Sequence, residues 1–300
     1  MNAIEIRGLT KSFRGLHAVD GLDMTVPAGS IYGFIGENGS GKSTTEKLIC
    51  GHLVADSGSI KLFGKSYRNS GIRMRVGALI ENAGCFPEAT IYQNLMMQAI
   101  NLGLPDADAQ IRRVLRIVRM EQHARLKIKK CSLGMKQRIG IAMALLGDPA
   151  LLILDEPING LDTDGARIMR EILTDITKNS GGTVLISSHI LGELEKIATH
   201  YGIIRQGRMI QELSAEEMDA RSRSFINVKT SDMEGTWHLL RRYFSDVRIG
   251  EDSFQVYSTE DTKEILKLLM MNRIPPTEVS RNHVGLEEYY IELMSRKEVA

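Results

Sequence analysis

The stretch Gly36-Glu37-Asn38-Gly39-Ser40-Gly41-Lys42-Ser43-Thr44 decides the fold of this chain, because it fits the phosphate-binding pattern G-x-x-x-x-G-K-[ST]. Glycines in such a loop let backbone amides curl around phosphate oxygens without a Cβ in the way. Lys42 can reach the β- and γ-phosphates, and the Ser43 hydroxyl can bind Mg²⁺. The pattern therefore predicts a nucleotide site formed by Asn38, Gly39, Ser40, Gly41, Lys42, Ser43 and Thr44.

The segments on either side of this loop agree with the prediction. Residues 30–35 are apolar and indicate a buried strand, and residues 43–50 indicate a helix. The amide-rich N-terminus of that helix attracts anionic phosphate. The rival interpretation is a glycine-rich turn between a strand and a helix, with no ligand.

Composition limits the classes of protein that this chain can represent. Its 300 residues are 43% hydrophobic and 25% charged, which is typical of a globular protein with one large domain and a smaller one. The formal net charge of +1 gives no reason to expect nucleic acid or an acidic membrane as a partner through bulk electrostatics. Any such partner has to be argued from a local site, and we expect no nucleic acid.

No targeting or membrane-spanning segment is expected from the sequence. The longest apolar run, residues 139–147, is far shorter than the roughly 20 residues that span a bilayer. The N-terminus lacks the basic and apolar regions of a signal peptide, so we expect a cytosolic protein. Cys50, Cys85 and Cys131 are widely spaced, which argues against disulfides or a zinc site and favours buried packing roles.

The pattern of apolar residues predicts an α/β fold with a separate tail. Strands are expected at residues 3–9, 19–26, 30–35, 57–64, 76–81, 151–154 and 183–187, with a hairpin over 201–211. A helical insert spans about 90–147, with Asp106 capping one helix, and a further helix covers 165–178. Residues 1–213 form one domain, and 215–300 form a small α+β domain with βαββαβ order.

Acidic residues follow the predicted strand at 151–154. In phosphoryl transfer, Asp155 can hold Mg²⁺ and Glu156 can orient and deprotonate an attacking water. An apolar run that ends in two acids is more often a solvated strand end, but a phosphate loop needs an acidic partner for its metal. His189 ends the next buried strand, where it can contact a γ-phosphate or have only a structural role.

Ser132 precedes another predicted helix. Its hydroxyl, together with the amides of the helix N-terminus, forms a second device that can bind an anion. The alternative is that Ser132 is an ordinary N-cap residue.

Together these motifs resemble the ATP-binding subunit of ABC transporters over about residues 3–213. The matching segments are residues 36–44, 132–137, 151–156 and 160–162, together with His189. The resemblance implies a P-loop NTPase core of ABC type with a helical subdomain. It also implies bound ATP and Mg²⁺, adenine stacked on Phe13, and catalysis by Lys42, Glu156 and His189.

The resemblance further implies partners. Ser132 and Gly134 would complete the site of a second ATP-binding subunit, identical or not, with Asp162 at the interface. A separate integral membrane permease would dock on residues 81–93 and hold the chain at the inner face of the membrane. ATP hydrolysis would then power transport.

Five residues depart from the common family pattern, namely Glu81, Cys131, Leu133, Met135 and Ile158. Glu81 stands where most members carry Gln, the residue that links the γ-phosphate and metal to the permease. This feature resembles the bacitracin-resistance and lantibiotic-immunity branch, which favours export of an antimicrobial peptide or a similar amphiphile. An acid near ATP should be unfavourable unless Mg²⁺ or another cation offsets its charge. A soluble ABC-type ATPase that acts as a switch in assembly or repair, and a scaffold that does not hydrolyse ATP, are the alternatives.

Overall fold

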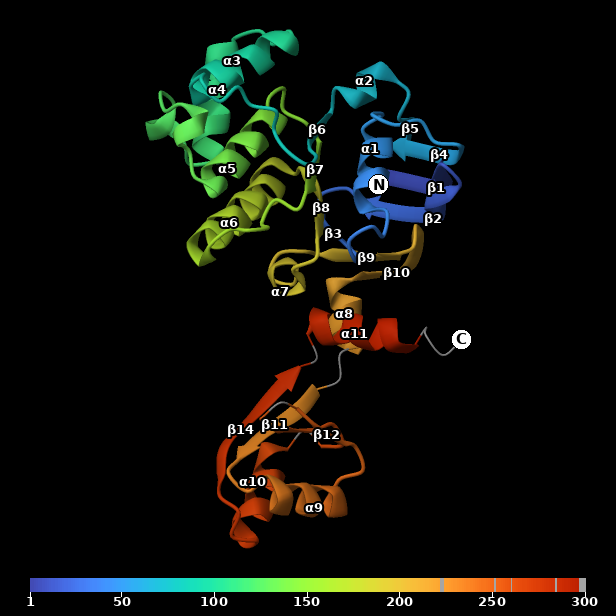
Figure 1. Ribbon diagram of the computed structural model, residues 1–300, viewed down its shortest axis with the longest axis vertical. Helices are drawn as coiled ribbons and strands as arrows, with labels where there is room; N and C mark the ends of the chain where they lie inside the picture. The colour runs from blue at the N-terminus through green and yellow to red at the C-terminus, as the bar shows by residue number, and fades with distance from the viewer. Residues whose placement is uncertain (222–223, 251, 260, 284, 297–300) are drawn as a thin grey trace. The chain divides into compact units, whose positions relative to one another are not determined.

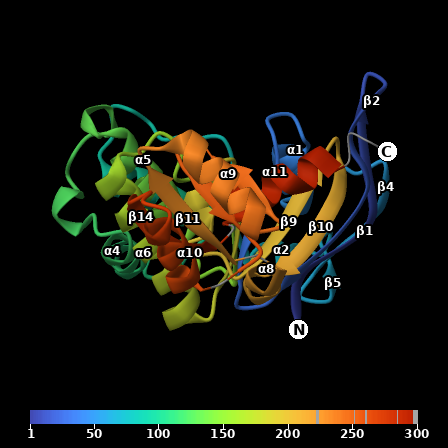
Figure 2. The same ribbon diagram turned by 90° about the horizontal axis from the view of Figure 1, so that it is seen from below.

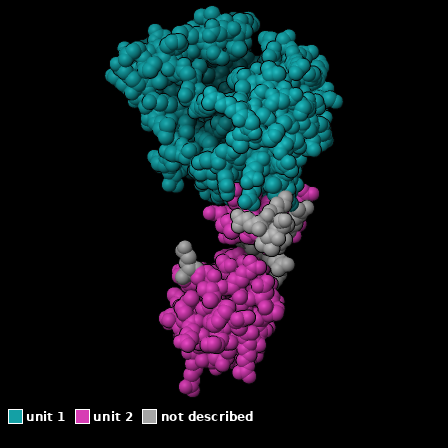
Figure 3. All heavy atoms as spheres, turned by 45° about the vertical axis from the view of Figure 1, so that its right-hand side comes forward, with its two compact units in different colours: residues 1–215 teal, residues 216–300 magenta. Residues whose placement is uncertain are grey.

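The chain forms two compact units. The computed structural model describes residues 1–221, 224–250, 252–259, 261–283 and 285–296. Residues 1–215 make up unit 1 and residues 216–300 make up unit 2 (Figure 3). None of the helices in the described ranges combines the length and the hydrophobicity needed to cross a bilayer.

Unit 1 contains two sheets (Figure 1). The antiparallel sheet has the order β2-β1-β4-β5, with β1 Asn2–Phe13, β2 Leu16–Pro27, β4 Ser57–Leu62 and β5 Lys65–Ser66. The other sheet has the order β10-β9-β3-β8-β7-β6, in which only β10 runs antiparallel to its neighbour. Its strands are β3 Ile31–Ile35, β6 Val76–Leu79, β7 Leu151–Asp155, β8 Thr183–Ser188, β9 His200–Arg205 and β10 Arg208–Ser214.

The main core of unit 1 lies between these sheets and includes helix α1, Lys42–Ile49 (Figure 1). Ile6 of β1, Leu48 of α1 and Phe34 of β3 are all fully buried in one cluster. Because α1 follows β3 directly, this packing fixes the loop between them, residues 36–41. The order β3-β8-β7 then places the ends of β7 and β8 beside that loop, since the three strands are parallel.

The insert between β6 and β7 is helical. It contains α3 Ile91–Asn101, α4 Ala107–Ile117 and α5 Leu133–Ala144, with short 3-10 turns η1 Glu121–His123 and η2 Ile128–Lys130. Thr90 and Gln93 form a reciprocal capping box at the start of α3. Asp106 occupies the N-cap position of α4, but the prediction that it caps the helix through its side chain is wrong, because the residue is left-handed at φ 52° and makes no cap bond.

The remaining helices of unit 1 are α2 Ser70–Arg73, α6 Thr163–Ser180 and α7 Leu191–Leu194. Helix α6 is longer than the predicted 165–178 because Asp162 caps it two residues earlier, with its Oδ1 accepting from the Gly165 amide at 2.9 Å. At its other end Gly181 adopts a left-handed φ of 64°, which ends the helix.

Unit 2 has the predicted βαββαβ order, preceded by helix α8 and followed by helix α11. The elements are α8 Ala215–Arg221, β11 Ser224–Thr230, α9 Met233–Tyr243, β12 Val247–Ile249, β13 Phe254–Val256, α10 Thr262–Met271, β14 Pro276–His283 and α11 Leu286–Arg296. The sheet is antiparallel, with the order β12-β13-β11-β14. Its core joins Val228 of β11 and Phe254 of β13 to Leu240 of α9 and Leu269 of α10.

The α/β class and the small C-terminal α+β unit are confirmed, and two local expectations are wrong. The strand predicted at residues 3–9 is longer, because β1 continues to Phe13 in register with β2. Only Cys131 is buried, whereas Cys50 and Cys85 are partly exposed. The 1–213 and 215–300 domain assignment, with its nucleotide-binding and accessory roles, stays a prediction.

Candidate functional site

The phosphate loop lines a cavity of about 230 Å³. Gly41 is left-handed at φ 110°, and a Cβ there would lie 2.4 Å from the Ala18 carbonyl oxygen, so only glycine fits. The cavity lining joins the predicted loop residues to the two predicted acids: Ala18, Asn38, Gly39, Gly41, Lys42, Ser43, Thr44, Asp155 and Glu156. Ser40 of the loop is buried and does not line the cavity, and its hydroxyl has no hydrogen-bond partner among the described residues.

Lys42 is held over the loop by backbone carbonyls. Its Nζ donates to the Gly36 oxygen at 2.6 Å and to the Glu37 oxygen at 3.1 Å. The ammonium is buried, so its charge acts in an environment of low polarity, where attraction to an anion is strong. This arrangement suits phosphate binding.

Asp155 and Ser43 form the candidate magnesium site. The Ser43 hydroxyl donates to Asp155 Oδ2 at 3.0 Å, joining residues 112 positions apart in the chain. Ser187 lies near the end of β8. Its hydroxyl donates to Asp155 Oδ1 at 2.7 Å and orients the carboxylate. Hydroxyl and carboxylate oxygens are ligands that Mg²⁺ prefers, and it commonly shares them with substrate phosphates. The residues therefore fit this ion.

Glu156 and His189 meet at the same edge. His189 Nδ1 lies 2.9 Å from Glu156 Oε2, and an ionised carboxylate only accepts hydrogen bonds, so that ring nitrogen then carries the proton. Glu156 is left-handed at φ 49°, a conformation that is costly for a residue with a side chain. Its amide donates to the Ser187 carbonyl and hydroxyl at 3.1 and 3.2 Å, which hold the strained backbone in place.

Glu81 lies just after β6 and is paired with a cation that the sequence analysis did not identify. Lys47 Nζ on α1 lies 2.5 Å from Glu81 Oε1. Glu81 is also left-handed, at φ 64°. The charge of this unusual acid is thus offset by Lys47 rather than left unbalanced beside the phosphate site. No local pattern in the sequence predicts this partner, because Lys47 and Glu81 are 34 positions apart.

The other predicted site residues lie apart from the phosphate cavity. The described residues that line this cavity do not include Phe13, Ser132, Gly134 or Asp162. Ser132 is the N-cap of α5 and accepts from the Met135 amide at 3.2 Å, and Asp162 caps α6. Phe13 is 45% exposed at the end of β1. Their roles toward nucleotide stay predictions.

A larger cavity of about 500 Å³ adjoins the acids. It is lined by Asp155 and Glu156, by residues 81–85 and Pro87, and by Leu133, Lys136 and Gln137 of α5. It therefore connects the edge that holds Asp155 and Glu156 with the segment that follows β6. Asn94 holds that segment, since its Oδ1 accepts from the Phe86 amide at 2.7 Å and its Nδ2 donates to the Phe86 and Thr90 carbonyls.

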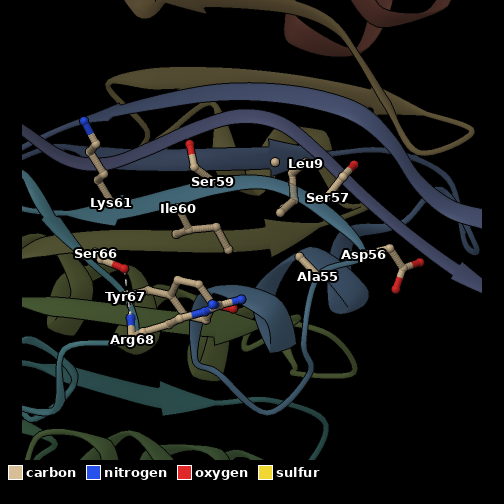
Figure 4. A pocket seen from close by; sticks show the side chains of 11 residues that line it. Leu9, Ala55, Asp56, Ser57, Ser59, Ile60, Lys61, Ser66, Tyr67 and Arg68 are labelled. Atoms are coloured by element: carbon tan, nitrogen blue, oxygen red, sulfur yellow. Dashed lines mark hydrogen bonds between the residues drawn. The ribbon is translucent and has the colours of Figure 1, made fainter.

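A separate cavity of about 320 Å³ lies beside β4 (Figure 4). Asp56 at its rim is paired with Lys11 at 2.7 Å, and this bond holds the pKa of the Asp56 carboxyl below its usual value. The guanidinium of Arg68 lies 5.8 Å from the Tyr67 ring centre. None of the predicted site residues lines this cavity, so it is not part of the candidate site.

Cys131 lies beside the Ser132 motif and has a packing role. It is 8% exposed, and its Sγ lies 3.5 Å from the Lys127 carbonyl oxygen. Burial raises the pKa of the thiol, which lowers its reactivity at neutral pH.

Glu46 is an additional buried acid that the sequence analysis did not single out. It lies one helical turn after Lys42 on α1 and is 0% exposed, and neither carboxylate oxygen has a hydrogen-bond partner among the described residues. Burial, and then the charge of Asp155, raise the pKa of the Glu46 carboxyl well above its usual value. A protonated Glu46 adds no negative charge behind the two acids.

Comparison with known proteins gives consistent matches. A family model described as ABC transporter matches residues 19–159. The bacitracin transport ATP-binding protein BcrA of Bacillus licheniformis is 36% identical over 297 residues, which cover 97% of each chain. The lantibiotic transport ATP-binding protein SrtF of Streptococcus pyogenes is 38% identical over 209 residues, covering 70% of this chain and 90% of that protein.

A solved structure matches as well. CbiO1 from Clostridium perfringens, described as part of the ABC transporter complex CbiONQ, has a TM-score of 0.67 and 26% identity. The match covers 81% of this chain and 96% of that one.

Glu46 predicts a pH dependence of stability. A carboxyl whose pKa is higher in the folded than in the unfolded chain binds more protons when folded. Stability therefore falls as pH rises from its unfolded pKa, near the ordinary 4.5, towards its folded pKa. Glu46→Gln should remove this loss, so the variant should gain stability over the wild type with rising pH, by at most about 1.4 kcal/mol per pH unit.

Urea unfolding from about pH 5 to about pH 9 measures this difference. The transition of unit 1 is the one that a bound nucleotide should shift. Glu121→Gln, at an acid whose side chain is 52% exposed, is the matched control and should run parallel to the wild type. Parallel curves for Glu46→Gln and the wild type would contradict the raised pKa.

Proposed function

The chain belongs to the ABC transporter family and is an ATPase of that family, and on this premise we propose a residue-level mechanism for it. Lys42 and the loop amides bind the triphosphate, and Ser43 and Asp155 hold Mg²⁺, which neutralises phosphate charge when bound. Glu156 accepts a proton from the attacking water, and His189 orients Glu156 and contacts the γ-phosphate. Phe13 stacks on the adenine.

The observation that carries this proposal is the contact between Ser43 and Asp155 at 3.0 Å. It brings the phosphate loop and the acidic strand end to one cavity, which Glu156 also lines. The pair of Glu156 and His189 at 2.9 Å then supplies the base and a group that orients it.

We further propose that two ATP-binding subunits enclose the nucleotide. Ser132 is the N-cap of α5 and Gly134 lies in the first turn of that helix, whereas the phosphate cavity is lined by the loop after β3 and the end of β7. A second subunit, either a copy of this chain or a related one, brings its own Ser132 motif to that cavity. Asp162 lies at the interface. A single chain carries both halves, so a homodimer has two complete sites.

The third element of the proposal is a separate membrane permease that docks on residues 81–93. Phe86 in this segment is 61% exposed, although the loop around it is held firmly by Asn94. A rigid loop with an exposed aromatic side chain suits a protein interface. The adjoining cavity of about 500 Å³ is lined by this segment and by Glu156, so a displacement of the segment can change the surroundings of Glu156.

The names of BcrA and SrtF support a cargo class. We infer that the transporter exports an antimicrobial peptide or a similar amphiphile, with this subunit on the inner face of the cell membrane.

Glu81 is the residue that we assign to coupling between nucleotide and permease, and it is also a candidate Mg²⁺ ligand once Lys47 releases it. The alternative with a different partner is a soluble ABC-type ATPase that acts as an assembly or repair switch. A scaffold that does not hydrolyse ATP is disfavoured by the Glu156–His189 pair.

Glu156→Gln tests the base. The variant should bind ATP, lose hydrolysis by at least about a hundredfold, and accumulate as a dimer in MgATP, because binding no longer leads to turnover. ATP hydrolysis and light scattering measure these effects. Asp148→Asn, at an acid whose side chain is 76% exposed, is the control and should behave like the wild type. Undiminished hydrolysis in Glu156→Gln would refute the base assignment.

Phe86→Ser tests the docking segment. Tagged wild-type chain, purified from detergent-solubilised membranes of its host, should bring down an integral membrane protein that mass spectrometry identifies. Phe86→Ser should lower its recovery several-fold, since truncating a central interface aromatic typically costs at least about 1 kcal/mol. Val54→Ser, at a side chain that is 65% exposed, should not. If the wild type brings down no membrane protein, the soluble alternative is favoured.

Glu81→Gln tests coupling. Because its pair with Lys47 is largely solvated, ATP affinity of the isolated chain should change by less than about fivefold. Bacitracin resistance of cells that express the chain with its permease should change. Lys47→Gln breaks the same pair but keeps the acid, so it separates loss of the pair from loss of the carboxylate. Unchanged resistance in Glu81→Gln would count against a coupling role.

A further inference from the structure

The outer side of α9 and α10 in unit 2 carries an unusual surface. Both helices lie on the same side of the sheet, as the two views of unit 2 show (Figures 1 and 2). Leu240, Ile265 and Leu269 face the sheet and are fully buried. Helical spacing then directs a second set of residues away from the sheet. This set, called the α9–α10 face below, comprises Arg241, Arg242, Lys263, Leu266, Lys267, Met270 and Met271, and all seven are exposed.

The α9–α10 face is basic although its unit is acidic. Residues 216–300 contain 12 Lys and Arg against 16 Asp and Glu, a formal net charge of −4. The face carries four cations, and the exposed acids on the same helices and at their N-caps are Asp232, Glu234, Asp261 and Glu264. These acids lie at the helix N-termini, whereas Arg241 and Arg242 lie in the last turn of α9. None of the four cations is in an ion pair with a described residue. The Arg241 and Arg242 guanidiniums instead lie 5.0 and 5.9 Å from the ring centres of Trp237 and Tyr243.

The same face exposes large apolar side chains. Leu266, Met270 and Met271 are 44%, 59% and 74% exposed. Lys263 and Lys267 lie one turn apart on α10, and the two methionines follow on the next turn. Unbranched Met and Leu side chains beside lysines form a surface that can insert shallowly into an apolar layer while the ammonium groups stay in a polar one.

We propose that the α9–α10 face docks on the headgroups of anionic lipids. A bilayer surface offers negative phosphates to the four cations and an acyl boundary to the methionines and Leu266. A nucleic acid or an acidic protein segment satisfies the cations but leaves the apolar side chains in water. The whole chain has a net charge of only +1, so the attraction comes from this local arrangement and not from bulk charge.

This contact is independent of the permease and of nucleotide. It requires only unit 2 and an anionic surface, so purified full-length chain should bind vesicles that contain no other protein. Because each cation near such a surface strengthens binding by roughly fivefold, loss of two should be readily measured. Screening by salt should weaken the binding in the same way.

Vesicle co-sedimentation of the full-length chain tests the proposal. The wild type should bind phosphatidylcholine vesicles that contain phosphatidylglycerol, in low salt, and should bind pure phosphatidylcholine vesicles weakly. Lys263→Glu with Lys267→Glu should lower binding by roughly tenfold or more. Met270→Ser with Met271→Ser should lower binding at both low and high salt, because it removes the inserted apolar groups and leaves the cations in place.

A matched charge change in unit 1 provides the control. Lys61→Glu with Lys65→Glu alters two exposed lysines on β4 and β5 by the same total charge and should leave binding unchanged. Equal loss of binding in the Lys61→Glu/Lys65→Glu and Lys263→Glu/Lys267→Glu variants would overturn the proposal. Absence of wild-type binding to anionic vesicles would overturn it as well. Retained ATP hydrolysis by each variant shows that unit 1 is folded and keeps this test separate from the ATPase mechanism, and an unchanged urea-unfolding transition of unit 2 shows the same for that unit.

Discussion

The hydrogen bond between Ser43 and Asp155 is the interaction on which the candidate site of unit 1 depends. It joins the phosphate loop after β3 to the end of β7, although a complete helical insert separates them in the chain. The contact arises because β8 lies between these strands and all three run parallel. A change in strand order would separate the loop from its acids even if every motif stayed intact. The chemistry of the site is therefore a property of sheet topology.

Much of this arrangement was predictable from the residues. The glycine-rich loop, the acids at 155 and 156 and the apolar strands are local signals with a physical cause, and the loop and the acids line one cavity in the structure. The sequence analysis did not single out Glu46, the pairing of Lys47 with Glu81, or the left-handed backbone of Glu156. Each depends on neighbours that are distant in sequence. Burial of a charged residue and strain at a strand end become visible only when packing is known.

The same limit applies to unit 2. Its βαββαβ order followed from alternating and helical patterns, and its sheet and core agree with them. The distribution of charge over the surface of unit 2 could not be predicted from the sequence, because net charge averages over faces that point in different directions. Arg241 and Lys263 lie on different helices, and the sheet on which both helices pack gives them a common face.

The buried hydroxyl of Ser187 has a consequence for how such a site can diverge. One oxygen contacts both acids, since it donates to Asp155 and accepts from the Glu156 amide. The carboxylate of Asp155 and the backbone of Glu156 therefore share one support. A substitution of Ser187 would remove one hydrogen bond from each of these neighbouring residues, so the orientation of the Asp155 carboxylate and the left-handed backbone of Glu156 would change together.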